Sequence, residues 1–202
     1  MYVAMVTCAA LDKLPLRDEG PQDRSFVSFR RSLTGALDKG NREWVVARID
    51  PAVRFSFGGD NGKAALLASW GREPALKDRF FKELRVVVGL GGGFRDGSFW
   101  APYTYAFWPD DLDAFEDAVA VRPLVRVKKE SRDDSETVTT LNYDVVKLVV
   151  EEGLAPAHWR KIEFNGKVGW ARTSDVRSGV DARACFTKVK GSWRLTAFVE
   201  GD

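Results

Sequence analysis

Histidine and cysteine, the residue types that most often act as base and nucleophile, are scarce in this chain of 202 residues: His158 is the single histidine, and the cysteines are Cys8 and Cys185. A thiolate activated by an imidazole could cleave amide or ester bonds. The strand pattern, however, places Cys185 in mid-strand, whereas such nucleophiles commonly lie at a helix N-terminus. One histidine also excludes a metal site built on two imidazoles. We therefore expect no catalytic residue and no metal ligand.

Two further patterns resemble sites of chemistry but lack the required spacing. Gly58–Lys63 lies between a predicted strand and a predicted helix, as a phosphate-binding P-loop does, but it is one residue short and Ala64 replaces the hydroxyl residue. The acidic run Asp110–Asp117 could offer paired carboxylates for glycosidic cleavage, yet nothing marks one pair. We expect no cofactor.

The most informative segment, Trp159–Trp170 (WRKIEFNGKVGW), predicts a β-hairpin. Its Asn165-Gly166 dipeptide favours the primed two-residue turn that matches the twist of paired strands, so the register follows residue by residue. The predicted opposite pairs are Phe164 with Lys167, Ile162 with Gly169, and Lys161 with Trp170.

Because side chains alternate along a strand, this hairpin has one apolar and one mixed face. Ile162, Phe164 and Ala171 share the apolar face, which we expect to be core. The mixed face sets two tryptophans diagonally across charged neighbours; its residues are Trp159, Lys161, Glu163, Val168 and Trp170.

The rest of the chain predicts an α+β fold. Asp23 or Ser25 can cap a helix with apolar residues at helical spacing, and further helices follow Asn41, Asn61 and Pro74. From about Val119 the apolar period changes to two. The boundaries we expect are an irregular leader 1–23, an α+β domain 24–117, a small β-barrel 118–178 and a C-terminal β-hairpin 179–202 that packs the two domains together.

That last hairpin turns at Lys190-Gly191 and has one face that must be buried. The residues that we expect on this face are Ala184, Phe186, Trp193, Leu195, Ala197 and Val199.

Composition gives only weak evidence on partners and compartment. A net charge of +2 gives no field that would attract nucleic acid, and no run approaches the roughly 20 apolar residues of a membrane span. The apolar N-terminus, Met1–Leu11, has no preceding basic residue and makes a poor signal peptide as written. A Cys8–Cys185 disulfide and a pair of free thiols both stay open.

The segment from about Val119 to Val176 resembles the bacterial SH3-like domain. A V-x-V-R strand, a polar loop and a W-x-K-V…G-x-x-G-W-V hairpin are typical of that family. Here Lys128-Lys129 and Ala171 depart from its pattern. The matching residues are Leu124–Val127, Val138–Leu141, Asp144–Val150, Trp159–Ile162 and Gly166–Ala171.

The whole chain is also similar to uncharacterised bacterial SH3-domain-containing proteins, whose R-x-x-F…G-x-W-R-L-T-x-F-V-x-G-D tail fits Arg183–Asp202. The resemblance implies an exported or lipid-anchored protein, periplasmic or envelope-associated, with a cytoplasmic location still open. It also implies a module that binds a peptide, a cell-wall fragment or another envelope protein beside a second domain.

Exposed aromatic rings bind extended chains at low entropic cost, so we expect the mixed face of the hairpin to be the ligand-binding surface. It would consist of Trp159, Trp170 and Tyr143, with Lys161 and Glu163 as polar anchors. We therefore expect a non-enzymatic binding or scaffolding protein.

Two alternatives remain. One is a hydrolase with its site at the interdomain cleft and the barrel as a targeting module. The other is an interaction protein whose aromatic residues are buried and whose charged loop, Lys128–Glu136, contacts the partner.

Overall fold

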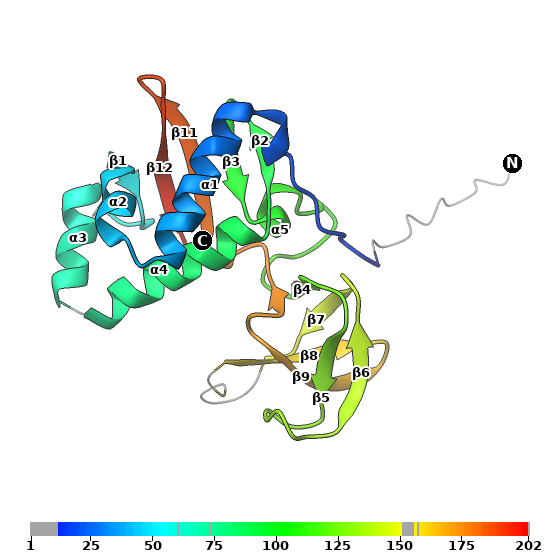
Figure 1. Ribbon diagram of the computed structural model, residues 1–202. Coiled ribbons are helices and arrows are strands. Elements are labelled where there is room, and N and C mark those ends of the chain that lie inside the picture. Colours follow the sequence, from blue (N-terminus) through cyan, green and yellow to red (C-terminus); the bar gives the residue numbers. More distant parts are fainter. Residues whose placement is uncertain (1–11, 60, 73, 151–155, 157, 202) are drawn as a thin grey trace, which may run out of the picture. The chain divides into compact units, whose positions relative to one another are not determined.

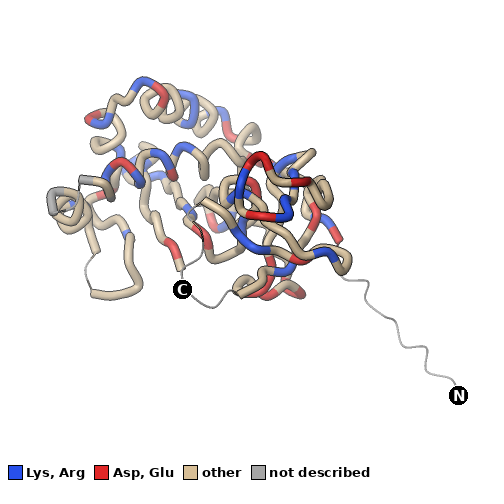
Figure 2. The backbone as a smooth tube through the Cα atoms, turned by 90° about the horizontal axis from the view of Figure 1, so that it is seen from below, with Lys and Arg blue, Asp and Glu red and all other residues tan. Residues whose placement is uncertain are grey.

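The computed structural model describes residues 12–201 except 60, 73, 151–155 and 157, and it divides the chain into two compact units (Figure 1). The first, the β unit, consists of residues 12–15 and 109–177; the second, the α+β unit, consists of residues 16–108 and 178–201. Helices and strands are both present, which confirms the α+β class. Residues of both charge signs are interspersed along the backbone of both units (Figure 2).

The α+β unit is built on a five-stranded sheet in the order β1-β12-β11-β3-β2. Helices α1 and α4 lie across one face of this sheet, where they bury the main apolar core (Figure 1). Its elements are η1 Gly20–Gln22, α1 Arg24–Asp38, α2 Arg42–Ala47, β1 Ile49–Arg54, α3 Lys63–Arg72, α4 Pro74–Gly89, β2 Gly93–Arg95, β3 Ser98–Ala101, α5 Tyr103–Ala106, β11 Arg183–Val189 and β12 Ser192–Val199.

The helix starts follow the local signals. The Asp23 carboxylate accepts hydrogen bonds from the backbone amides of Ser25 and Phe26, so Asp23 is the N-cap of α1. Asn41 caps α2 in the same way by accepting from Trp44. The strand expected around residues 52–57 begins and ends three residues earlier, because it pairs in parallel with β12 from Ile49 onward.

The C-terminal hairpin differs most from expectation. It is not a separate segment that joins two domains: β11 and β12 lie at the centre of the five-stranded sheet, between β3 and β1. Its register also shifts after Cys185, where Cys185 pairs with Ala197 and Phe186 pairs with Leu195. The extra residue, Thr196, forms a β-bulge that exchanges the two faces of β12.

The bulge corrects the expected buried face. Ala184, Phe186, Trp193 and Leu195 belong to the core beneath the helices, together with Phe198. Ala197 and Val199 are also buried, but they pair with Cys185 and Arg183 and so lie on the opposite side of the sheet.

The β unit contains a seven-stranded antiparallel sheet in the order β10-β4-β7-β8-β9-β5-β6. In the described residues the order ends at β10 and β6, and no pairing joins these two strands. The strands are β4 Asp117–Ala120, β5 Val125–Lys128, β6 Thr137–Leu141, β7 Val145–Leu148, β8 Trp159–Phe164, β9 Lys167–Arg172 and β10 Val176–Arg177.

The unit boundaries lie at Pro15/Leu16, Trp108/Pro109 and Arg177/Ser178. Part of the expected leader therefore belongs to the β unit: Lys13 forms a β-bridge with Asp144, and the Leu14 amide donates to the Tyr143 carbonyl. The second boundary lies nine residues before the expected one at 117/118, so the acidic run enters β4 in the β unit.

The β8–β9 hairpin has the predicted register at every pair: Phe164 with Lys167, Ile162 with Gly169, and Lys161 with Trp170. Ile162 and Ala171 are fully buried in the core of the β unit, as expected for the apolar face.

Candidate functional site

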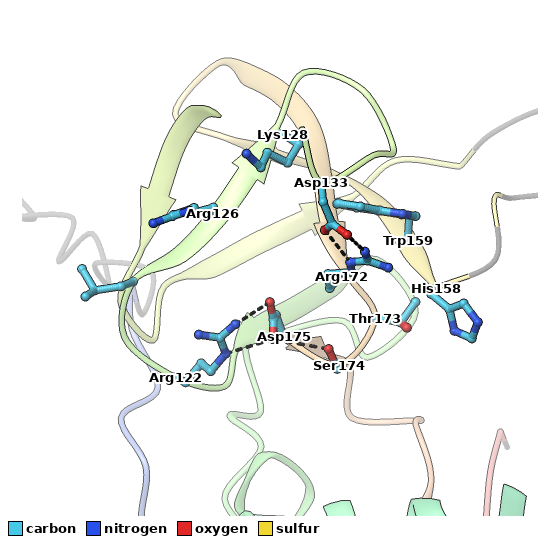
Figure 3. A pocket seen from close by; sticks show the side chains of 11 residues that line it. Arg122, Arg126, Lys128, Asp133, His158, Trp159, Arg172, Thr173, Ser174 and Asp175 are labelled. Atoms are coloured by element: carbon cyan, nitrogen blue, oxygen red, sulfur yellow. Dashed lines mark hydrogen bonds and ion pairs between the residues drawn. The ribbon is translucent and has the colours of Figure 1, made fainter. Parts of the chain in front are cut away.

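The outer surface of the β unit carries a pocket of about 790 Å³ (Figure 3). It draws side chains from β5, from the loop after β5, from the start of β8 and from the end of β9. The residues that line it are Arg122, Leu124, Arg126, Lys128, Asp133, His158, Trp159, Arg172, Thr173, Ser174 and Asp175.

Strand β5 places two cations at this pocket. Val125 and Val127 are fully buried in the core, so the alternate residues Arg126 and Lys128 point to the outer side. Lys128 pairs directly with Trp170 of β9, so the Lys128 side chain lies on the same face of the sheet as the tryptophans of β8–β9. Continuing this antiparallel register sets Arg126 level with Arg172.

Trp159, which we expected to be an exposed ring, is only 6% exposed. The guanidinium carbon of Arg172 lies 4.3 Å from the centre of its ring, a cation–π contact between residues that pair directly across the hairpin. Arg172 is held there by the Asp133 carboxylate, which accepts a 3.1 Å bond from its Nε and a second bond from Nη2. The charged loop thus folds back over the hairpin and turns the expected open surface into a pocket that one tryptophan lines.

The other expected site residues are not gathered there. Trp170 is half-buried and has the Lys161 ammonium 5.7 Å from its ring centre, one step along the same face. Glu163 is exposed and lines a different pocket. Tyr143 lies in the turn between β6 and β7, and it is not among the residues that line the Trp159 pocket.

Two residues of the pocket have left-handed backbone conformations. Leu124 has a φ of 58° and His158 a φ of 68°; this region is tolerated by histidine but makes a bulky residue such as leucine a genuine outlier. The Leu124 side chain is 70% exposed, so burial does not compensate the conformational cost. The Asn142 side chain fixes the turn by accepting from the Leu124 amide at 3.0 Å. Strain of this kind is concentrated at functional sites.

A bidentate ion pair closes the lower side of the pocket as drawn in Figure 3. The Nε and Nη2 atoms of Arg122 each lie 2.9 Å from an oxygen of Asp175. Asp175 is buried, and its carbonyl accepts from the Val121 amide, so the pair also anchors β4 next to β10.

A second pocket of about 610 Å³ surrounds β7 and contains two lysines, each paired with a buried carboxylate. The Lys13 ammonium lies 2.6 Å from Asp144, and the Lys147 ammonium lies 2.7 Å from Asp117. The hydrogen bond to Asp117 raises the pKa of Lys147. These ion pairs join the N-terminal segment and β4 to β7, which is a structural role.

The described residues give no arrangement for metal binding. Among them, no group of three or more histidine, cysteine, aspartate or glutamate residues is placed to hold a metal ion. Cys185 is buried, and its Sγ lies 3.7 Å from the Thr187 hydroxyl. Cys8 lies outside the described residues, so the structure does not decide between a Cys8–Cys185 disulfide and two free thiols. In the part of the chain that the structure describes, no helix has the length and apolarity to cross a membrane.

Sequence reasoning missed several pocket residues, although signals for them exist. Extending the predicted hairpin register by two pairs would have set Arg172 opposite Trp159. The alternation V-R-V-K already marked Arg126 and Lys128 as outward-facing. Leu124 and Asp133 carry no local signal, because only the folded turn and the returning loop bring them to the pocket.

Searches of known protein families, of curated proteins and of solved structures found no match to this chain.

Proposed function

We propose that this chain is a non-enzymatic binding protein of the bacterial envelope and that its β unit is an SH3-like module that recognises a peptide or a cell-wall component. The binding site in this proposal is the Trp159 pocket instead of the open face of the hairpin. The support is physical: the pocket combines an indole, an exposed leucine and several guanidinium groups, the mixture typical of ligand sites.

The observation that carries the proposal is Leu124. A leucine with a φ of 58° costs about 1–2 kcal/mol relative to a glycine at the same place. Its side chain regains little of that cost by burial, because it is 70% exposed. Because folding alone does not account for an exposed leucine at this position, we assign its side chain to contact with a ligand.

The sharpest test therefore replaces Leu124 with glycine in the full chain. Glycine adopts this backbone conformation freely, so we expect Leu124→Gly to be as stable as the wild type or more stable by about 1 kcal/mol. Binding of the ligand should nevertheless weaken about tenfold, since an apolar contact of this size is worth one to two kcal/mol.

Lys190→Gly is the matched control. Lys190 also has a positive φ, 50°, but it lies in the β11–β12 turn of the other unit. It should gain stability in the same way and leave binding unchanged. The ligands are identified first by titrating soluble cell-wall fragments and a peptide library while recording the Trp159 indole N–H signal by NMR. If no ligand moves that signal, or if Leu124→Gly binds as tightly as the wild type, the proposal is wrong.

A further inference from the structure

The charges of the Trp159 pocket do not balance. Four cationic side chains line it, from Arg122, Arg126, Lys128 and Arg172, against the two carboxylates of Asp133 and Asp175.

Both carboxylates are already occupied. Asp175 receives both bonds of the Arg122 fork at 2.9 Å, and Asp133 receives the Arg172 fork. Bidentate pairing of this kind uses the acceptor directions that a carboxylate offers to a guanidinium. The pocket therefore has no free carboxylate for its remaining two cations.

Those two cations are Lys128 and Arg126. The Lys128 ammonium donates to the Ser135 carbonyl at 2.8 Å and to the Thr137 hydroxyl at 3.2 Å, and these neutral acceptors leave its charge uncompensated. Arg126 is exposed on the outer side of β5, and among the described residues its guanidinium makes no hydrogen bond or ion pair. Arg126 lines the pocket, and its guanidinium offers five N–H donors.

Apolar surface lies beside these charges. Leu124, two residues before Arg126 in the chain, also lines the pocket, and Figure 3 shows the Trp159 ring across the pocket from Arg126 and in contact with Arg172. A ligand that complements these residues carries both an anionic group and an apolar group.

We infer that the pocket binds a carboxylate adjacent to an apolar group, with Arg126 as the bidentate partner of the carboxylate and the exposed Leu124 as the apolar contact, while Trp159 and Arg172 form the opposite wall. This inference rests on the proposed function and names its ligand class. The planar guanidinium fork matches a carboxylate in shape as well as charge, and Lys128 adds attraction at longer range. A peptide C-terminus and an acidic sugar both offer this chemistry.

The test uses two acids and their neutral counterparts on the full chain. N-acetyl-leucine is compared with N-acetyl-leucine amide, and N-acetylmuramic acid is compared with N-acetylglucosamine, which lacks the lactyl carboxylate. Dissociation constants come from the NMR shifts of the Trp159 indole N–H and the Arg126 Nε–H. We expect at least one acid to bind about tenfold more tightly than its counterpart, the usual value of a charge-assisted hydrogen bond. Which acid does so distinguishes a peptide source from a sugar source.

Arg126→Gln should remove the tenfold difference between each acid and its neutral counterpart. Because Arg126 is exposed, the variant should fold normally, and Lys190→Gln serves as the control for loss of one exposed charge in the other unit. Raising the salt from about 20 mM to about 200 mM should weaken the acids alone, since screening acts on the charge pair.

The outcomes separate the two proposals. If acids and neutral probes bind equally at Trp159, the carboxylate inference is overturned and the binding function stands. If the acids bind but Arg126→Gln does not affect them, the assignment to Arg126 is overturned. If inorganic phosphate displaces the acids and binds more tightly, the pocket is a general anion site and the carboxylate class is wrong. If no probe moves the Trp159 signal, the inference is wrong and the proposed function loses its support as well.

Discussion

The two long hairpins of this protein have similar turns but different surroundings. The β8–β9 hairpin turns at Asn165-Gly166 and the β11–β12 hairpin at Lys190-Gly191, and the first residue of each turn has a φ of 50°. The register of β8–β9 is unbroken, and its core residues lie on one face, whereas the opposite face buries only Trp159, under Arg172. The register of β11–β12 shifts at Thr196, and buried residues lie on both of its faces.

This difference shows what each hairpin can do. Both hairpins are paired along both edges, β11–β12 by β3 and β1 and β8–β9 by β7 and β5, but β11–β12 has core residues on both faces, and these hold its unit together. The β8–β9 hairpin has one face outside the core, and there the charged loop and Arg172 shape a pocket around Trp159. A hairpin with one face outside the core can carry a binding site on that face with little loss of stability.

The largest effect should come from the core of β11–β12. Phe186 is fully buried, with ring centres 6.0 Å from Phe26 and 5.6 Å from Phe29. We expect Phe186→Ala to lower the free energy of unfolding by about 3–5 kcal/mol. In β8–β9, Phe164 is half-buried, so Phe164→Ala should cost about 1–2 kcal/mol. Urea denaturation measures both, and equal losses would contradict the contrast between the hairpins.

The next effect tests how closely β9 approaches β5. A Cβ at Gly169 would lie 2.7 Å from the Lys128 carbonyl oxygen and 2.7 Å from Val127 Cγ1. Gly169→Ala should therefore cost about 1–3 kcal/mol and weaken pocket binding, because β5 carries the cations. The exposed neighbour Val168 is the control: Val168→Ala should change stability by less than about 0.5 kcal/mol. A fully stable Gly169→Ala would show that the two strands are further apart.

A smaller effect is expected at the bulge. The Thr196 hydroxyl lies 3.0 Å from the Thr187 hydroxyl and donates to the Cys185 carbonyl at 3.3 Å. These hydrogen bonds tie the bulged residue of β12 to β11. Thr196→Val should lower stability by about 1 kcal/mol. Thr140→Val, at an exposed position of β6, should leave the unfolding midpoint nearly unchanged. If the two variants behave alike, the hydroxyl does not stabilise the bulge.

The smallest effect depends on pH. Hydrogen bonds from the Ser25 hydroxyl, the Lys188 ammonium and the Phe26 amide hold the pKa of Asp23 well below its usual range. A lowered pKa in the folded state stabilises the protein above the ordinary carboxyl pKa of about 4, and this contribution is lost as the pH falls further. Asn at this position keeps the cap but not the charge. The difference in melting temperature between wild type and Asp23→Asn should be constant above about pH 5 and shrink below about pH 4. A difference that stays constant down to about pH 2 would contradict this.

Local patterns predicted the elements well where neighbours in sequence decide them. The turn dipeptide Asn165-Gly166 gave every pair of the β8–β9 register, and Asp23 and Asn41 proved to be helix caps. The place of the C-terminal hairpin in the five-stranded sheet was missed, because pairing between β1 and β12 joins residues nearly 150 positions apart and leaves no local mark. The bulge at Thr196 was missed for the same reason: Thr196 continues a regular alternation.

For the candidate site, the sequence alone determined which side chains share a face. Strand alternation and one tight turn are local rules, so Trp159, Lys161 and Trp170 lie on a common side of β8–β9 whatever surrounds them. Only the tertiary structure decided how far each of them is exposed. Asp133 returns across the hairpin to hold Arg172 over Trp159, and β5 adds Arg126 and Lys128 alongside. Exposure depends on contacts between segments distant in the chain, and no short-range pattern encodes them.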